Sequence, residues 1–503
     1  MKNHPFTRIL SVILVLCMLA VPVLMTSCAD ETEQPDQDDT TTPDTPTEPT
    51  DKPEDEKIVY KANVPSGLDL GNEEFRILVY DNSNSTWYDV DFSATQFTSD
   101  IINDASYQRM TQVEEELNTD VVAYPSPLYG FEYMNTAVSA GDDLYDAGIV
   151  AARRAVTLAE RGYLYDLFDD DVILDTEAPW WDQGSTSGLS VANRLFMIAG
   201  DISILYRKSV RVYYFSKQIA SDYADEIPNM YELVDNGEWT MEALAECVMA
   251  VSQDIDGDDE MTGNDMYGLI YTVDTMGTGL IGAGVQIVSK DEDDMPQLTF
   301  YNDDTVAAFD MISEIIYDYD HAITGTDNRP NANGLGSMFM SNRSLFNNCE
   351  LHNIAAFRAM ETDFGILPTP KYDEYQENYR SIINPVPAGM IVIPITNDVN
   401  LDNTCYVLDA LGAASKNILT PAYIETYLEG RGARDEESRT SLNIVFNNIV
   451  FDLGYIYNWG NIATFSYDLV RQKASNFTSA YEKIATSAQT KLEETLAVYE
   501  KLD

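Results

Sequence analysis

The feature that most constrains the fold is the alternation of short apolar runs with segments of helical periodicity. Phe75 to Tyr80 has the composition of a buried strand, and 100–117 places Met110, Val113 and Leu117 on one face of a helix. Further strands are expected over 121–124, 145–150 and 194–198. Strands separated by helices pair in parallel, so this part of the chain predicts an open α/β lobe.

The same alternation returns after residue 205. Strands are expected over 210–215, 267–273, 364–367 and 390–394, with a helix opened by Thr240 and another that carries Val306, Phe309, Ile312 and Ile315 on one face. The rest of the chain is mostly helical. Thr420-Pro421 is expected to begin one helix, and 484–499 traces a face of the last. A second lobe is the economical explanation.

The N-terminus predicts export. A short basic region precedes an apolar run from Ile9 to Leu24, which is typical of a secretory signal. Met25-Thr26-Ser27-Cys28 resembles the bacterial lipobox, with Met25 where Leu is usual. We therefore expect a signal peptide over 1–27 and a lipidated Cys28. The alternatives are an ordinary signal followed by a free thiol, or an uncleaved anchor helix, although the run is shorter than the roughly 20 residues that span a bilayer.

A tether and a body follow the signal. Residues 28–57 are rich in Asp, Glu, Thr and Pro and lack the apolar residues needed to fold, so we expect a disordered acidic tether. Beyond it no stretch has the length and hydropathy of a membrane span. The body holds three cysteines, and because an odd number gives no disulfide framework, we expect at least one buried free cysteine; they are Cys247, Cys349 and Cys405.

Charge and histidine content exclude several functions. The chain has 503 residues and a formal net charge of −54, and a surface this acidic repels nucleic acid. The three histidines are too few for a multi-histidine metal centre, and with no GxSxG motif a serine-histidine triad has no support. Paired carboxylates for glycoside hydrolysis can be drawn almost anywhere among 84 acids, so none stands out.

Two loops merit attention. Gly277 to Gly282 matches the dinucleotide fingerprint formally, but the residues after it do not predict a phosphate-binding helix, and a glycine-rich loop is expected instead. The segment 254–265 spaces oxygen ligands as a calcium loop does, with Asp259 where Gly is usual and Asp at the last position where Glu is typical. The segment is equally well interpreted as a calcium-binding loop or as a solvated acidic turn. The candidate ligands are Asp254, Asp256, Asp258, Glu260, Thr262 and Asp265.

Tryptophans offer candidate binding surfaces. Trp180 and Trp181 lie among turn-forming residues, and Trp87 and Trp459 also lie outside periodic apolar faces. Flat rings with an N–H group suit stacking on a sugar, so these four are assigned to a cleft, the alternative being that each caps a core. Trp239, just before a helix, is assigned to the core.

Several segments in this order resemble the sugar-binding branch of the extracellular solute-binding proteins of bacterial ABC importers, in their lipoprotein form. The resemblance covers the body from about residue 70. The segments are Ile102-Asn103-Asp104-Ala105, Val113-Glu114-Glu115, Asn118, Tyr145-Asp146, Gly162-Tyr163-Leu164, Pro179-Trp180-Trp181-Asp182, Gly200-Asp201, Gly237-Glu238-Trp239-Thr240, Asp265-Met266-Tyr267-Gly268, Asp363-Phe364-Gly365-Ile366-Leu367-Pro368 and Arg434-Asp435-Glu436-Glu437-Ser438.

The resemblance implies a periplasmic-binding-protein-like fold of type II, with two α/β lobes, each an open sheet with flanking helices, and a C-terminal helical segment. Lobe 1 would comprise 58–202 and about 388–430, and lobe 2 would comprise 203–387 and about 431–503. The chain would cross near 200–205, again near 385–394 and once more late, with the C-terminal helices on lobe 2.

The implied function is to capture a carbohydrate between the lobes and to deliver it to ABC permease subunits. An oligosaccharide is the expected ligand. The protein would be a lipid-anchored, extracytoplasmic monomer that is not an enzyme and requires no cofactor. Whether the acidic loop holds a structural calcium ion stays open. Trp180, Trp181, Trp87 and Trp459 are expected to contact the ligand, with Asp201 accepting from its hydroxyl groups. A glycan-processing enzyme and a calcium-stabilised surface adhesion module are the alternatives.

Overall fold

The fold is described from a computed structural model, which describes residues 58–81, 87, 90–326, 334–424 and 436–502. The predicted signal peptide, Cys28 and the tether lie outside the described residues. Residues 58–503 form one compact unit, and the elements below belong to it.

The first sheet has the strand order β12-β3-β1-β2. Strands β1 (Glu73–Tyr80), β2 (Thr119–Ser126) and β3 (Ala147–Ala151) are parallel, and β12 (Gly389–Val392) joins β3 antiparallel. Helices α1 (Ile101–Leu117), α2 (Phe131–Ala140), α3 (Ala152–Ala159) and α13 (Leu401–Asn417) accompany this sheet. We call this part lobe 1; the predicted β-α-β start is confirmed.

The second sheet has the order β10-β4-β9-β5-β8. Its strands are β4 (Arg211–Ser216), β5 (Tyr267–Tyr271), β8 (Ala322–Thr324), β9 (Ser344–Glu350) and β10 (Phe364–Leu367). Strand β5 is parallel to its neighbours β8 and β9, and β4 is antiparallel to β9 and β10. We call this part lobe 2. Its helices include α6 (Lys217–Asp222), α7 (Met230–Asp235), α8 (Met241–Val251), α9 (Thr275–Gly282) and α10 (Asp303–Ile316).

Helix starts follow side-chain caps that the sequence contains. Asp100 accepts from the N–H of Asn103 at the start of α1, and Thr240 accepts from that of Ala243 at the start of α8. Each bond satisfies one of the backbone donors that a helix end leaves unpaired. The predicted helix start at Thr240 is therefore confirmed, and α8 buries Leu244, Val248 and Val251 as expected.

The chain passes between the lobes three times. The first crossing includes α5 (Leu205–Lys208), the second includes β11 (Ser381–Ile382) and the third includes β13 (Ile449–Val450). Strands β11 and β13 pair in parallel, so the second and third crossings are hydrogen-bonded to each other.

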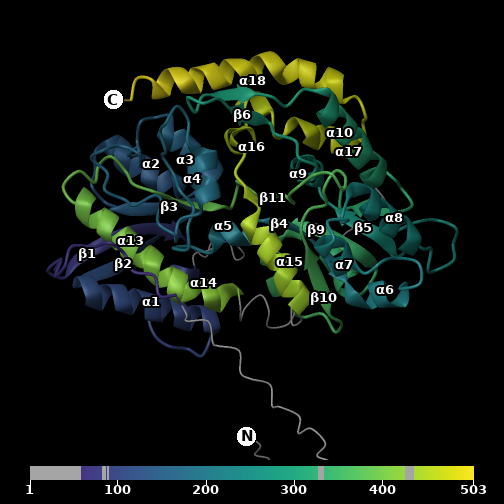
Figure 1. Ribbon diagram of the computed structural model, residues 1–503, viewed down its shortest axis with the longest axis horizontal. Coiled ribbons are helices and arrows are strands. Elements are labelled where there is room, and N and C mark those ends of the chain that lie inside the picture. Colours follow the sequence, from purple (N-terminus) through teal and green to yellow (C-terminus); the bar gives the residue numbers. More distant parts are fainter. Residues whose placement is uncertain (1–57, 82–86, 88–89, 327–333, 425–435, 503) are drawn as a thin grey trace, which may run out of the picture. The chain divides into compact units, whose positions relative to one another are not determined.

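The C-terminal helices contact both lobes, which corrects the prediction that they pack on lobe 2. Helix α15 (Glu436–Asn447) does contact lobe 2, where Ser441 bonds the carbonyl of Ile366. Helix α18 (Phe477–Tyr499) extends over both lobes (Figure 1). At its start the Phe477 ring lies 4.9 Å from that of Phe309 in lobe 2, and at its end the Tyr499 ring lies 4.8 Å from that of Phe196 in lobe 1.

Three local predictions are wrong. Gly277 to Gly282 is part of helix α9 and fully buried, not a loop. Residues 194–198 make isolated bridges from Arg194 and Ile198 rather than a strand. Thr420 does not cap a helix; it lies inside the short α14 (Leu419–Pro421) and donates to Asp201.

The prediction about the cysteines of the body is confirmed. Cys247, Cys349 and Cys405 are buried free thiols. The part of the chain that the structure describes contains no helix with the length and hydropathy needed to span a bilayer.

Candidate functional site

Side chains that follow the parallel strands meet between the lobes. Ligands of α/β sheets bind at the carboxyl ends of strands, so these positions are the expected place for a site. After β3, the Arg153 guanidinium donates to the carbonyl of Tyr455 (2.8 Å). Tyr455 lies in α16 (Leu453–Tyr457), and its ring packs against Gly277 of α9. Helix α16 therefore connects α3 of lobe 1 to α9 of lobe 2.

A buried cation lies at the start of lobe 2. Arg211 is the first residue of β4, and its side chain is 1% exposed. Its guanidinium donates to Glu350 Oε1 at 2.8 Å and lies 3.8 Å from a carboxylate oxygen of Asp274. It also donates to Thr272 Oγ1 and Asn348 Oδ1. Four acceptors thus surround one guanidinium, which fixes its position.

Glu350 is held ionised by its neighbours. Burial by itself raises the pKa of this carboxyl, but the charge of Arg211 and a hydrogen bond from the Asn384 amide (2.9 Å) lower the pKa to about 2. Because Asn384 follows β11, this contact ties the second crossing to the end of β9.

Asp274 offers a carboxylate that solvent can reach. It follows β5, its side chain is 25% exposed, and it accepts a hydrogen bond from the hydroxyl of Tyr467. Tyr467 lies in α17 (Phe465–Gln472). Burial and the nearby Asp274 raise the pKa of Tyr455 to about 12, so this phenol stays neutral.

An aromatic pair joins the two lobes. The Trp87 ring, after β1, lies 4.1 Å from the His352 imidazole, after β9, with 42° between their planes. Burial lowers the pKa of His352 to about 4 although Glu350 opposes the shift, so the imidazole is neutral at pH 7. Together these side chains form what we call the interlobe cluster: Trp87, Arg153, Arg211, Asp274, Glu350, His352, Tyr455 and Tyr467.

The interlobe cluster has the chemistry of a polyol site. Ionised carboxylates accept from hydroxyl groups, guanidinium groups donate to them, and aromatic faces pack against the apolar faces of a sugar ring. Of these residues only Trp87 was predicted from the sequence. The others could have been found by looking one to three residues beyond each predicted strand, where Arg153 and Asp274 stand.

The tryptophan doublet belongs to the core of lobe 1, which corrects the assignment to a cleft. Trp180 and Trp181 are buried, and both indole N–H groups donate to Asp409 Oδ1 of α13, at 3.1 and 3.3 Å. Burial raises the pKa of Asp409 to about 6, although these bonds and the N–H of Asp175 oppose the shift. Both rings thus have structural partners.

Asp201 and Trp459 also bond to other side chains of the protein rather than face a cleft. Asp201 is buried and bound to Arg207 (3.0 Å), Lys416 (3.2 Å) and the Thr420 hydroxyl (2.8 Å), so it joins the first crossing to the end of α13. Trp459 is buried beneath α18, where its indole N–H donates to Thr495 at 2.8 Å. Of the five predicted ligand contacts, Trp87 alone lies in the interlobe cluster. Trp239 is fully buried, as predicted.

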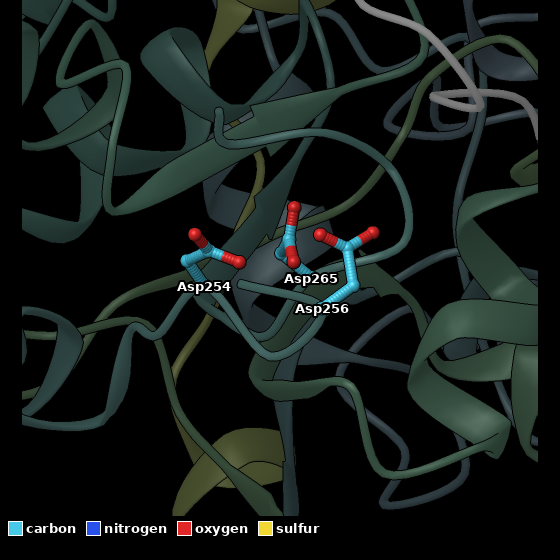
Figure 2. Close-up of side chains that lie close together, drawn as sticks. All are labelled: Asp254, Asp256 and Asp265. Carbon is cyan, nitrogen blue, oxygen red and sulfur yellow. The ribbon is translucent and has the colours of Figure 1, made fainter. Parts of the chain in front are cut away.

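The acidic loop brings three of its six candidate ligands together. Oxygen atoms of Asp254, Asp256 and Asp265 lie within 4.8 Å of one another (Figure 2). Asp259, at the position where calcium loops carry Gly, has φ of 65°, so it adopts the left-handed conformation that glycine usually supplies.

The same carboxylates also serve the loop backbone. Asp265 accepts from the N–H groups of Ile255 (3.0 Å) and Thr262 (2.7 Å), and Asp254 accepts from that of Gly257 (2.7 Å), which lowers its pKa. Ionised oxygens in a turn of this shape are compatible with a hard cation, since each carboxylate oxygen has a second lone pair.

No protein-family model matches the sequence, and no curated protein is similar to it. Among solved structures, ABC substrate-binding protein Lmo0181 from Listeria monocytogenes, in complex with cycloalternan, is 12% identical, with 85% of this chain and 99% of that chain covered and a TM-score of 0.53. The chain has the two-lobe α/β fold of such binding proteins.

Two further structures support the assignment of the fold. A cyclo/maltodextrin-binding protein complexed with maltotetraose is 11% identical, with 84% of this chain and 97% of that chain covered and a TM-score of 0.55. The GacH receptor of Streptomyces glaucescens, described unliganded and with acarbose, is 13% identical, with 84% of this chain and 98% of that chain covered and a TM-score of 0.53. The predicted fold class is thus confirmed over most of the body.

Proposed function

We propose that this protein is the solute-binding component of an ABC importer and captures an oligosaccharide between its lobes. The observation that carries the proposal is the interlobe cluster, at the carboxyl ends of strands in a two-lobe fold. Proteins with similar folds hold cycloalternan and maltotetraose. The protein would then deliver its ligand to permease subunits and catalyse no reaction itself. An enzyme would instead release products from a glycan panel on long incubation.

Oligosaccharide titration tests the proposal. Linear and cyclic glucose oligomers are titrated while tryptophan fluorescence, to which Trp87 contributes, and the melting temperature are followed. A saccharide at 100 times its Kd is expected to stabilise the protein by about 2.7 kcal/mol. If no saccharide changes either signal while peptides or other solutes do, the carbohydrate assignment fails.

A pair of variants locates the site. Asp274→Asn removes the charge of the most exposed carboxylate in the interlobe cluster and is expected to weaken saccharide binding by about tenfold. Asp310→Asn, at an exposed position of α10, is the matched control and is expected to bind as the wild type does. Equal affinities for both variants would place the ligand elsewhere.

We also propose that Cys28 carries a lipid and holds the protein on the outer face of the cell membrane. The support is the lipobox-like sequence before Cys28 and the acidic segment after it. Cys28→Ser is expected to move the protein from the membrane fraction to the soluble one, and mass spectrometry of the wild-type N-terminal peptide should show the diacylglyceryl thioether. An unmodified thiol would refute the anchor.

For the acidic loop we propose a structural calcium ion held by Asp254, Asp256 and Asp265. The convergence of these carboxylates supports it. Calorimetry with CaCl₂ is expected to give heat of binding for the wild type and for Asp310→Ala, and to lose it for Asp256→Ala. Absent heat in all three would leave the loop as an acidic turn.

A further inference from the structure

A pocket lies where the two lobes meet the crossings. It has a volume of about 560 Å³, which is within the range of small-molecule sites. Its walls come from α4 (Gln183–Leu189) of lobe 1, β6 (Val288–Lys290) of lobe 2, and the second and third crossings. None of the residues of the interlobe cluster lines it. We call it the hinge pocket.

Arg380 is the unusual residue of the hinge pocket. It precedes β11 on the second crossing and is partly buried. Its Nε is buried without a hydrogen-bond partner, and among the described residues the guanidinium makes no hydrogen bond or ion pair. Burial lowers the pKa of Arg380, opposed by the charge of Asp452. A buried N–H group without an acceptor costs free energy, so a ligand that accepts from this guanidinium gains affinity.

The neighbouring charges are already engaged. Asp452 accepts from the N–H groups of Tyr455 (3.0 Å) and Ile287 (2.9 Å). Lys290, the other cation of the lining, donates to the Ser187 carbonyl (2.7 Å), the Ser190 hydroxyl (2.8 Å) and Asp294 (2.9 Å). Its three donors are therefore used. Within the described part of the lining, Arg380 is the cation with donors to offer.

The rest of the lining favours an oxyanion with further polar groups. Asn378, Asn447, Asn448, Ser187 and Ser289 are among the lining residues. The Asn448 amide already donates to the Ile444 carbonyl and the Ser187 hydroxyl to that of Gln183, so their oxygens are acceptors only. A guanidinium presents two parallel N–H donors that match the two oxygens of a carboxylate or phosphate. Amides and hydroxyls can bond the remaining oxygens of a molecule larger than a single ion.

We propose that the hinge pocket is a second ligand site, which takes a small organic anion through a carboxylate or phosphate bound to Arg380. Because α4, β6 and both crossings line the pocket, such a ligand contacts both lobes at once. The net charge of −54 repels anions over the whole surface, so we expect millimolar affinity. The proposal does not depend on carbohydrate binding at the interlobe cluster.

The test uses the full protein with sodium citrate and sodium phosphate as probes, and sodium chloride at the same ionic strength as the reference. Matching ionic strength is essential because salt alone screens an acidic protein. At least one probe is expected to raise the melting temperature above the chloride value and to give a saturable calorimetric isotherm. The two probes distinguish a carboxylate ligand from a phosphate ligand. If neither exceeds chloride, the proposal is wrong.

Three variants assign the effect to Arg380. Arg380→Gln is expected to weaken probe binding at least about tenfold, and Arg380→Lys to fall between it and the wild type because it keeps the charge but not the paired donors. Arg471→Gln, at an exposed arginine of α17 paired with Asp468, removes the same charge and is expected to bind as the wild type does.

Stability without probe separates a ligand site from a structural role. Arg380 makes no hydrogen bond among the described residues, but its charge interacts with Asp452, so Arg380→Gln is expected to melt in chloride close to the wild-type temperature. A much lower melting temperature, or unchanged probe binding by Arg380→Gln, would overturn the proposal.

Discussion

Asp409 illustrates how a single residue changes the interpretation of a motif. The adjacent tryptophans at 180 and 181, set among turn residues, predicted an exposed stacking surface. Both indoles instead donate to one carboxylate of α13, which lies more than two hundred residues further along the chain. Without knowledge of that partner, a loop tryptophan and a core tryptophan look alike in sequence.

Asp409 should give the protein a measurable pH dependence. Its pKa is about 6 in the folded state and 3.8 in the reference state, so the native protein binds more protons between these values. Stability is therefore lost as pH rises from about 4 to 6. Denaturant titrations should show the wild type losing about 3 kcal/mol relative to Asp409→Asn over this range. Asp310→Asn is the control, and parallel curves for wild type and Asp409→Asn would contradict the prediction.

Glu350 should act in the opposite direction. Its folded pKa of about 2 is below the reference value of 4.5, so its contribution is complete above 4.5 and disappears as pH falls through 2. Glu350→Gln also leaves Arg211 buried without its closest carboxylate, and we expect a loss of about 3–5 kcal/mol at pH 7. Chemical denaturation should show this difference shrinking below pH 4.5. A constant difference would indicate lost packing rather than lost charge.

At the level of elements, α9 shows why a glycine-rich segment was misread. Glycine in a helix costs about 1 kcal/mol relative to alanine, so Gly277, Gly279 and Gly282 predicted a loop. In the structure a methyl group at each would meet a neighbour: Tyr455, Ile312 and Thr369 respectively. Tertiary packing thus overrides the low helix propensity of glycine.

The caps at Asp100 and Thr240 were predictable because their partners are three residues away.

Helix α18 should be sensitive to one glycine beneath it. Gly460 has φ of 56°, and a methyl group there would meet the backbone of Ser487 and Ala488 in α18. We expect Gly460→Ala to lower the melting temperature and to accelerate hydrogen exchange in α18. Gly141→Ala is the matched control, since Gly141 also has positive φ (76°) but no atom nearby. Its cost should be only the backbone strain of about 1 kcal/mol. Equal effects of the two variants would show that α18 is not held by this contact.

At the scale of the whole molecule, the net charge of −54 opposes the folded state. Salt screens repulsion between exposed carboxylates, and the Debye length falls from about 30 Å at 0.01 M to about 10 Å at 0.1 M. We expect the melting temperature to rise with NaCl over this range and then to level off. Scanning calorimetry at fixed pH measures the melting temperature at each NaCl concentration. A melting temperature that stays constant or falls would mean that nearby cations already offset the charge of the acidic side chains.

The sequence anticipated the two lobes because each has its own strand and helix periodicities. It did not anticipate what joins them. Lys290 and Asp294, around the turn between β6 and β7 (Pro296–Leu298), bond Ser187, Ser190 and Asn193 of lobe 1, and α18 contacts both lobes. Such contacts depend on how the lobes face each other, which no local pattern encodes. For the same reason the interlobe cluster was missed apart from Trp87.

The antiparallel strand β12 has a consequence for synthesis. Met390 pairs with Val150, so the sheet of lobe 1 is completed by a segment that the ribosome makes after most of lobe 2. Until then β3 is an unpaired apolar edge, the kind of surface that recruits strands from other chains. Nascent chains that end before this segment therefore expose that edge, and a bound chaperone would cover it.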